Sequence, residues 1–78
     1  MPSGPDPDSI AASLRSLGER IRAVREEQKL SQEDVGRATK LGRSAIDRIE
    51  QGALDASIDD LLLIAYVLDV PLAELVVD

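Results

Sequence analysis

The stretch from Leu30 to Gly52, LSQEDVGRATKLGRSAIDRIEQG, decides the fold of this chain. Ser31 followed three residues later by Asp34 is a helix-start signal, and it predicts a short helix over residues 32–39. The next three residues predict a turn, after which a second helix runs over residues 43–51 and stops at a glycine. Apolar side chains recur at the inward-facing positions of both segments. The stretch therefore predicts two amphipathic helices joined by a tight turn.

The exposed face of the second predicted helix is polar over its first two turns. At helix positions one, two, five and six it carries Arg43, Ser44, Asp47 and Arg48. A recognition helix docks its N-terminal end in the major groove of DNA, where arginine pairs with guanine, serine contacts several bases and aspartate accepts from cytosine. The amides and the Gln32 side chain at the start of the preceding helix, and Lys40 in the turn, suit contacts to phosphate. The pattern indicates a helix-turn-helix over residues 31–51.

The alternative is that these four side chains are ordinary solvated residues on a small helical bundle. Asp47 favours this alternative, because DNA phosphates repel a carboxylate that has neither a cytosine amine nor an arginine as its partner. We expect Arg43 or Arg48 to be that partner.

Composition limits the class of protein. A chain of 78 residues forms one domain near the lower size limit for a self-supporting core. It has no cysteine and no histidine, which excludes disulfides, most zinc sites and the commonest general base. We therefore expect no enzyme, no metal and no cofactor. The longest apolar run, residues 61–68, is too short to span a bilayer, and no signal-peptide pattern is present, so we expect a cytoplasmic protein without membrane contact.

The net charge of −6 argues against a nucleic-acid binder, but its distribution argues for one. Residues 1–13 carry a net charge of −2, whereas residues 14–48 hold all nine basic residues and carry +3. Residues 49–78 hold seven acids and no base, for −7. The charge partition predicts a bipolar surface, although an acidic tail that keeps a small protein soluble explains the second half equally well.

The segments outside this stretch also indicate helices. Residues 1–9 hold three of the four prolines and are expected to form a disordered arm before a domain over residues 10–78. A helix is expected over about residues 14–29, opened by a Ser16–Glu19 capping box or extended upstream over residues 10–13.

The C-terminal half predicts two more helices. Ser57 and Asp60 form a third start signal, and Pro71 opens a last short helix through Leu75. No segment alternates like a strand, so the chain is expected to be all-α with five helices. The inward positions expected in the second and fourth helices are Val35, Ala38, Ile58, Leu61, Ile64, Ala65 and Leu68.

The chain resembles the Cro and phage-repressor type of helix-turn-helix proteins, also called the Xre family. The resemblance runs without gaps from about Leu17 to Leu75 and rests on three stretches at the right spacing: LSQEDV, RSAIDRIEQG and LDVPLAEL. It implies a compact five-helix bundle of the lambda-repressor-like DNA-binding type. Among family members, small phage repressors and the controller proteins of restriction-modification systems are similar in length and acidity.

The resemblance also implies roles for particular residues. Gln32 corresponds to a phosphate-binding residue, Arg43 and Ser44 to the leading base-contacting positions, and Asp47 and Arg48 to supporting ones. Arg25 and Glu50 correspond to a partly buried ion pair, the alternative being two exposed charges worth less than about 1 kcal/mol.

Three departures from the family pattern stand in and around the recognition helix. Gly42 and Ile49 are tolerable replacements of the usual cap and core residues. The loop over residues 53–56 lacks the usual bases, so phosphate contacts at Gly52 and Ala53 are expected from backbone amides.

These observations predict a sequence-specific DNA-binding transcription regulator, of repressor or controller type, that binds a palindromic operator as a homodimer. The expected dimer surfaces are the C-terminal residues Leu72, Val76 and Val77 and the upstream segment 10–14, unless the last residues are a frayed terminus. The alternative is a protein-interaction module, such as an antitoxin, that docks a partner protein through its acidic C-terminal half.

Overall fold

Helices make up the fold throughout the described part of the chain. The structure, a computed structural model, describes residues 7–53 and 55–76. Its helices are α1 (Pro7–Glu27), α2 (Gln32–Thr39), α3 (Arg43–Glu50), α4 (Ile58–Leu68) and α5 (Leu72–Leu75), and these residues contain no strand. The all-α, five-helix fold predicted from the sequence is confirmed.

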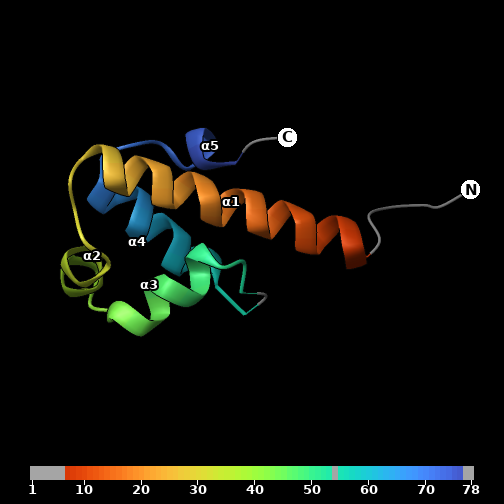
Figure 1. Ribbon diagram of the computed structural model, residues 1–78, viewed down its shortest axis with the longest axis horizontal. Coiled ribbons are helices and arrows are strands. Elements are labelled where there is room, and N and C mark those ends of the chain that lie inside the picture. Colours follow the sequence, from red (N-terminus) through yellow and green to blue (C-terminus); the bar gives the residue numbers. More distant parts are fainter. Residues whose placement is uncertain (1–6, 54, 77–78) are drawn as a thin grey trace, which may run out of the picture.

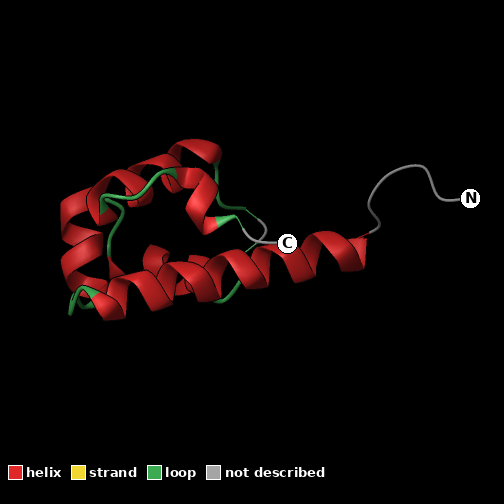
Figure 2. Ribbon diagram, turned by 90° about the horizontal axis from the view of Figure 1, so that it is seen from above, coloured by secondary structure: helices red, strands yellow, loops and turns green. Residues whose placement is uncertain are grey.

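The long helix α1 packs directly against α3 and α5. In Figure 1, α2 and α3 lie below one end of α1 and α5 lies on the opposite side of it. Helix α2 packs against both α3 and α4, while α3 and α5 contact α1. Figure 2 shows that the N-terminal turns of α1 extend beyond the other helices.

One hydrophobic core holds the five helices together. Every helix contributes at least one fully buried aliphatic side chain to it, and burying such a side chain stabilises the fold by about 1.5–3 kcal/mol. These core residues are Ile21, Val35, Ile46, Ile64, Leu68 and Leu75.

Two expected inward residues lie at the surface instead. Ala38 is exposed because α2 turns Val35, Gly36 and Thr39 toward the core. Ile58 is 59% exposed, since α4 buries the face that carries Leu61 and does not bury its own first residue.

The start of α1 also differs from the sequence prediction. The helix begins at Pro7, a residue that suits the first helical turn, so residues 7–9 are helical and do not belong to an arm. Residues 1–6 of the expected arm lie outside the described residues. Ser16 and Glu19 lie inside α1, so the capping box expected there is wrong.

The start signals of α2 and α4 are present. In α2 the Ser31 hydroxyl accepts from the Asp34 amide and the Asp34 carboxylate accepts from the Ser31 amide, both at 2.9 Å. In α4 the Ser57 hydroxyl accepts from the Asp60 amide at 3.1 Å. Both serines therefore act as N-caps, as their spacing predicts.

The described ranges hold neither a helix long and apolar enough to cross a membrane nor a cluster of three or more residues that could bind a metal ion.

Candidate nucleic-acid interface

The turn between α2 and α3 sets the angle of α3 relative to α2. Lys40 ends α2 in the left-handed conformation, with φ of 64°, and its amide donates to the Arg37 carbonyl. The amide of Gly42 donates to the Gly36 carbonyl at 3.1 Å. A side chain at Gly36 would collide with the backbone of Gly42, so this glycine lets the turn fold back tightly onto α2.

A buried ion pair ties α3 to α1. The Arg25 guanidinium donates to both carboxylate oxygens of Glu50, at 2.7 and 3.1 Å, and to the Leu30 carbonyl at 2.8 Å. Arg25 is 7% exposed and Glu50 is 8% exposed, so the structure has the buried form of this pair. The hydrogen bonds to Glu50 raise the pKa of Arg25 above its ordinary value. Removing one partner of such a pair costs about 3–5 kcal/mol, because the other charge stays buried.

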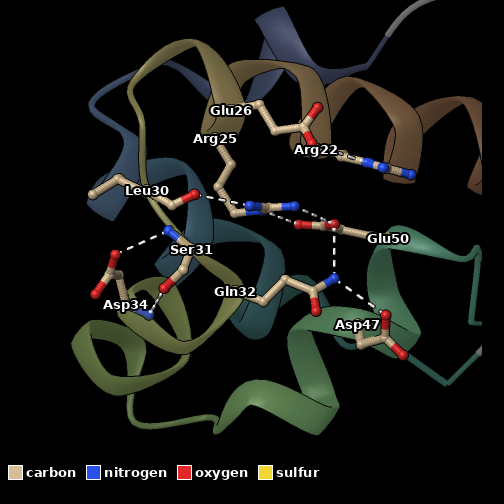
Figure 3. Close-up of polar contacts among 9 residues, drawn as sticks. All are labelled: Arg22, Arg25, Glu26, Leu30, Ser31, Gln32, Asp34, Asp47 and Glu50. Carbon is tan, nitrogen blue, oxygen red and sulfur yellow. Dashed lines mark hydrogen bonds and ion pairs between the residues drawn. The ribbon is translucent and has the colours of Figure 1, made fainter.

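Gln32 extends this ion pair into a network that reaches the middle of α3. Its side-chain amide donates to Asp47 and to Glu50, each at 3.1 Å. Figure 3 shows Arg25, Glu50, Gln32 and Asp47 pointing toward one another from α1, α2 and α3. Both amide hydrogens of Gln32 are therefore engaged within the protein. A contact from this amide to phosphate requires one of these bonds to be exchanged.

Asp47 is held by amides rather than by an arginine. One of its oxygens accepts from Gln32, and the other accepts from the Gln51 side chain at 2.8 Å. These hydrogen bonds, with that from Gln32 the stronger cause, lower the pKa of Asp47 below its ordinary value. The expected ion pair between Asp47 and Arg43 or Arg48 is absent from the described residues: Arg48 pairs with Asp55 instead. Arg43 lines the same cleft as Asp47 and, through its charge, also lowers the pKa of Asp47.

Arg48 has a partner that the sequence analysis missed. Its terminal nitrogen donates to both carboxylate oxygens of Asp55 at 2.7 Å, and both side chains are exposed. The pair raises the pKa of Arg48 and lowers that of Asp55. The contact crosses the glycine stop of α3, so helical spacing gives no signal of it. Asp55 thus neutralises the positive charge of Arg48, which would otherwise be exposed without an ion-pair partner.

Arg43 and Ser44 form the exposed leading end of α3, and among the described residues neither side chain makes a hydrogen bond. An open cleft of about 460 Å³ lies beside them, between α3 and the start of α2. Arg22 of α1 lines it as well, a cation that the sequence analysis did not single out. The cleft is lined by Arg22, Arg25, Ser31, Gln32, Glu33, Arg43 and Asp47.

The amides expected to hold phosphate after α3 are already used. The Gly52 amide donates to the Ile49 carbonyl and the Ala53 amide donates to the Arg48 carbonyl, both at 3.0 Å. This pair of bonds is the Schellman ending of a helix, with Gly52 at φ of 91°. Both donors are therefore engaged in capping α3, and phosphate contacts from these two amides stay a prediction that requires these bonds to be shared or exchanged.

The expected dimer residues at the C-terminus differ in accessibility. Leu72 is partly buried against the core, Val76 is 58% exposed, and Val77 lies outside the described residues. Their role in a dimer stays a prediction.

Comparison with known proteins identifies the family. The family model described as a helix-turn-helix domain matches residues 16–76. The chain belongs to the helix-turn-helix family. This helix-turn-helix protein is also similar in structure to the restriction-modification controller protein C.AhdI from Aeromonas hydrophila, with 34% sequence identity and a TM-score of 0.78 over 82% of this chain and 97% of that one. The search of curated proteins gave no significant match. Together the family and the structural likeness support a DNA-binding regulator.

Proposed function

We propose that this helix-turn-helix protein is a sequence-specific transcription regulator that reads base edges with the N-terminal end of α3. One observation carries the proposal: Arg43 and Ser44 are exposed at the leading end of a helix that a buried network fixes to α1 and α2. Fixing the backbone of α3 while leaving its first turn accessible is what direct readout in the major groove requires.

The remaining contacts divide between bases and phosphates. Asp47 and Arg48 support Arg43 and Ser44 on the base-reading face. Ser31, Gln32 and Glu33 at the start of α2 line the cleft together with Arg22 of α1, and Lys40 lies in the turn that ends α2. The amides of that helix start and these two cations contact the phosphates of the DNA backbone. These contacts fix the position of α3 on the duplex, and α3 supplies the sequence preference.

One α3 helix of eight residues reads only a half-site, so the regulator acts as a homodimer on a palindromic operator. C.AhdI is a controller protein of a restriction-modification system, and we propose a comparable regulatory role for this chain.

Substitution of Arg43 by alanine tests the reading role. We expect Arg43→Ala to lose about 1–3 kcal/mol of binding free energy on the best operator selected from a pool of random duplexes, and to discriminate less between bases at one position. Fluorescence anisotropy with the selected operator and its single-base variants measures both effects.

The matched control is Arg20→Ala, which removes the same charge from α1 beside the Glu74 carbonyl. We expect this control to keep the wild-type base preference. Selection of no preferred sequence by the wild-type protein at low salt would reject the proposed function. An unchanged base preference in Arg43→Ala would reject the role of Arg43 alone.

A further inference from the structure

The outer face of α4 carries a cluster of large side chains that the core does not use. We define this α4 outer face by Asp59, Leu62, Leu63 and Tyr66, which line one shallow hollow on the surface. Leu62 is 49% exposed, Leu63 is 42% exposed, and Tyr66 is 84% exposed. Tyr66 is the only aromatic residue of the chain. Single exposed apolar residues are ordinary, but a contiguous group with an amphipathic tyrosine is typical of a protein interface.

The surroundings of this face exclude DNA as its occupant. Asp59 and Asp60 begin α4, Asp69 ends it, and residues 49–78 carry no basic residue. An acidic rim repels phosphate. The apolar centre therefore fits a protein surface, and the rim restricts which surface that is.

We propose that the α4 outer face binds the same face of a second copy of this chain, with the two α4 helices antiparallel and the two-fold axis between Leu62 and Leu63. The inference rests on the proposed function, because it names the surface through which two DNA-reading units pair. It also replaces the C-terminal and upstream surfaces expected from the sequence as the main interface.

The order of side chains along the face is self-complementary in this register. A two-fold axis midway between positions 62 and 63 brings Leu62 against Leu63 of the second copy, as an isologous interface requires. It also brings Asp59 against Tyr66 of the second copy, where the phenol hydroxyl donates to the carboxylate. Each such pair occurs twice in the dimer. In this register apolar side chains therefore meet apolar side chains at the centre, and polar groups meet polar groups at both ends.

The register also separates the acidic groups. Asp60 falls opposite Ala65 of the second copy, as Asp59 falls opposite Tyr66, so neither acid in the first turn of α4 faces another acid. Parallel packing would instead place Asp59 against Asp59. Like charges at that distance oppose association, which favours the antiparallel arrangement.

The other expected dimer surfaces offer less apolar area. Leu72 and Leu14 are partly buried in the core of their own chain, which leaves Val76 and Ile10 as exposed apolar side chains at distant sites. Neither site combines adjacent leucines with an aromatic residue.

Cysteine cross-linking tests the surface and its register together, because the natural chain has no cysteine. We expect an equimolar mixture of Asp59→Cys and Tyr66→Cys proteins to form a disulfide-linked dimer under mild oxidation. Neither variant should cross-link alone, since the two copies of position 59 lie about 10 Å apart along the helix axes, too far for a disulfide. Cross-linking within either single variant, or none in the mixture, would overturn the proposal.

Sedimentation equilibrium without DNA provides the second measurement. We expect Leu62→Gln to raise the dimer dissociation constant roughly a hundredfold, because the substitution occurs twice in a two-fold dimer. Val76→Gln and Ile10→Gln, the matched controls, should change it less than about threefold. Thermal unfolding at high protein dilution verifies that Leu62→Gln still folds, as expected for an exposed position.

These results separate the inference from the proposed function. A wild-type monomer, or a dimer lost in Val76→Gln and kept in Leu62→Gln, overturns the α4 interface even if the protein binds DNA. A dimer with the expected cross-link supports the interface even if selection finds no operator.

Discussion

At the scale of single residues, the face of α3 that we propose to read bases has some side chains held by hydrogen bonds and others that are free of them. Asp47 is clamped by Gln32 and Gln51, and Arg48 is held by Asp55. A side chain that already lies in one position loses little conformational entropy on binding, and it accepts fewer alternative bases. Arg43 and Ser44 carry no such restraint in the described structure. We infer that Asp55 is a positioning residue that sharpens the base preference of Arg48.

Substitution of Asp55 by asparagine tests this positioning. We expect Asp55→Asn to reduce discrimination at the base pair read by Arg48 by about two- to fivefold, the modest range suited to an exposed pair. Binding to non-specific DNA should strengthen, because a carboxylate that competes with phosphate for Arg48 is gone. Anisotropy titrations with the selected operator and its single-base variants measure both effects.

The control for the lost charge is Asp69→Asn, at an exposed left-handed position that asparagine tolerates well. If Asp55→Asn and Asp69→Asn strengthen binding to every duplex equally, Asp55 acts only through net charge and positions nothing.

At the scale of helices, close backbone contact fixes α3 against α1. A side chain at Gly18 would lie 2.6 Å from the Ile49 carbonyl oxygen and nearer still to that of Glu50. Glycine therefore lets the end of α3 sit directly on α1, where Arg25 reaches Glu50. Glycine within a helix costs roughly 1 kcal/mol relative to alanine, and here the approach of the two helices offsets that cost.

Alanine at position 18 tests whether this approach matters. We expect Gly18→Ala to lower the free energy of unfolding by about 1–3 kcal/mol, because overpacking outweighs the gain in helix propensity. Urea denaturation followed by circular dichroism measures the change. Ser13→Ala, at an exposed position of the same helix, is the control and should be nearly neutral or slightly stabilising. If the Gly18→Ala protein is more stable than wild type, α1 and α3 can move apart without a loss of stability, and the close approach does not matter.

At the scale of the whole molecule, the fold sorts the charges. The basic half of the chain supplies Arg22, Lys40 and Arg43 around the α2 and α3 starts, whereas the acidic half surrounds α4. A net negative protein thus presents cations where DNA is proposed to bind and excludes phosphate elsewhere. Arg22 already pairs with Glu26, and Arg48 already pairs with Asp55. Few cations are therefore free to displace the counterions bound to DNA phosphates.

The salt dependence of operator binding tests this small number. We expect the logarithm of the binding constant to fall against the logarithm of salt concentration with a slope of about −2 to −3 per subunit, since each neutralised phosphate contributes roughly −0.9. Anisotropy titrations between low and physiological salt give the slope. A slope near zero would show that these cations make no phosphate contacts.

The sequence by itself determined the elements whose signals are local. The start of α2 and the N-caps Ser31 and Ser57 follow from hydrogen bonds that span three residues. Such bonds form wherever a serine is followed three residues later by an aspartate at a helix start, so they can be predicted from the sequence. Its likeness to a family also located the Arg25–Glu50 pair.

Tertiary structure alone decided the partners that lie far apart in the chain. Sequence spacing does not show that Gln32 reaches Asp47, that Arg48 turns to Asp55, or that α4 leaves Tyr66 uncovered. Nor does it show that ending α3 consumes the amides of Gly52 and Ala53. Each of these depends on how the packed helices direct a side chain or close a loop, and that direction is set by the shared core rather than by neighbours in the sequence.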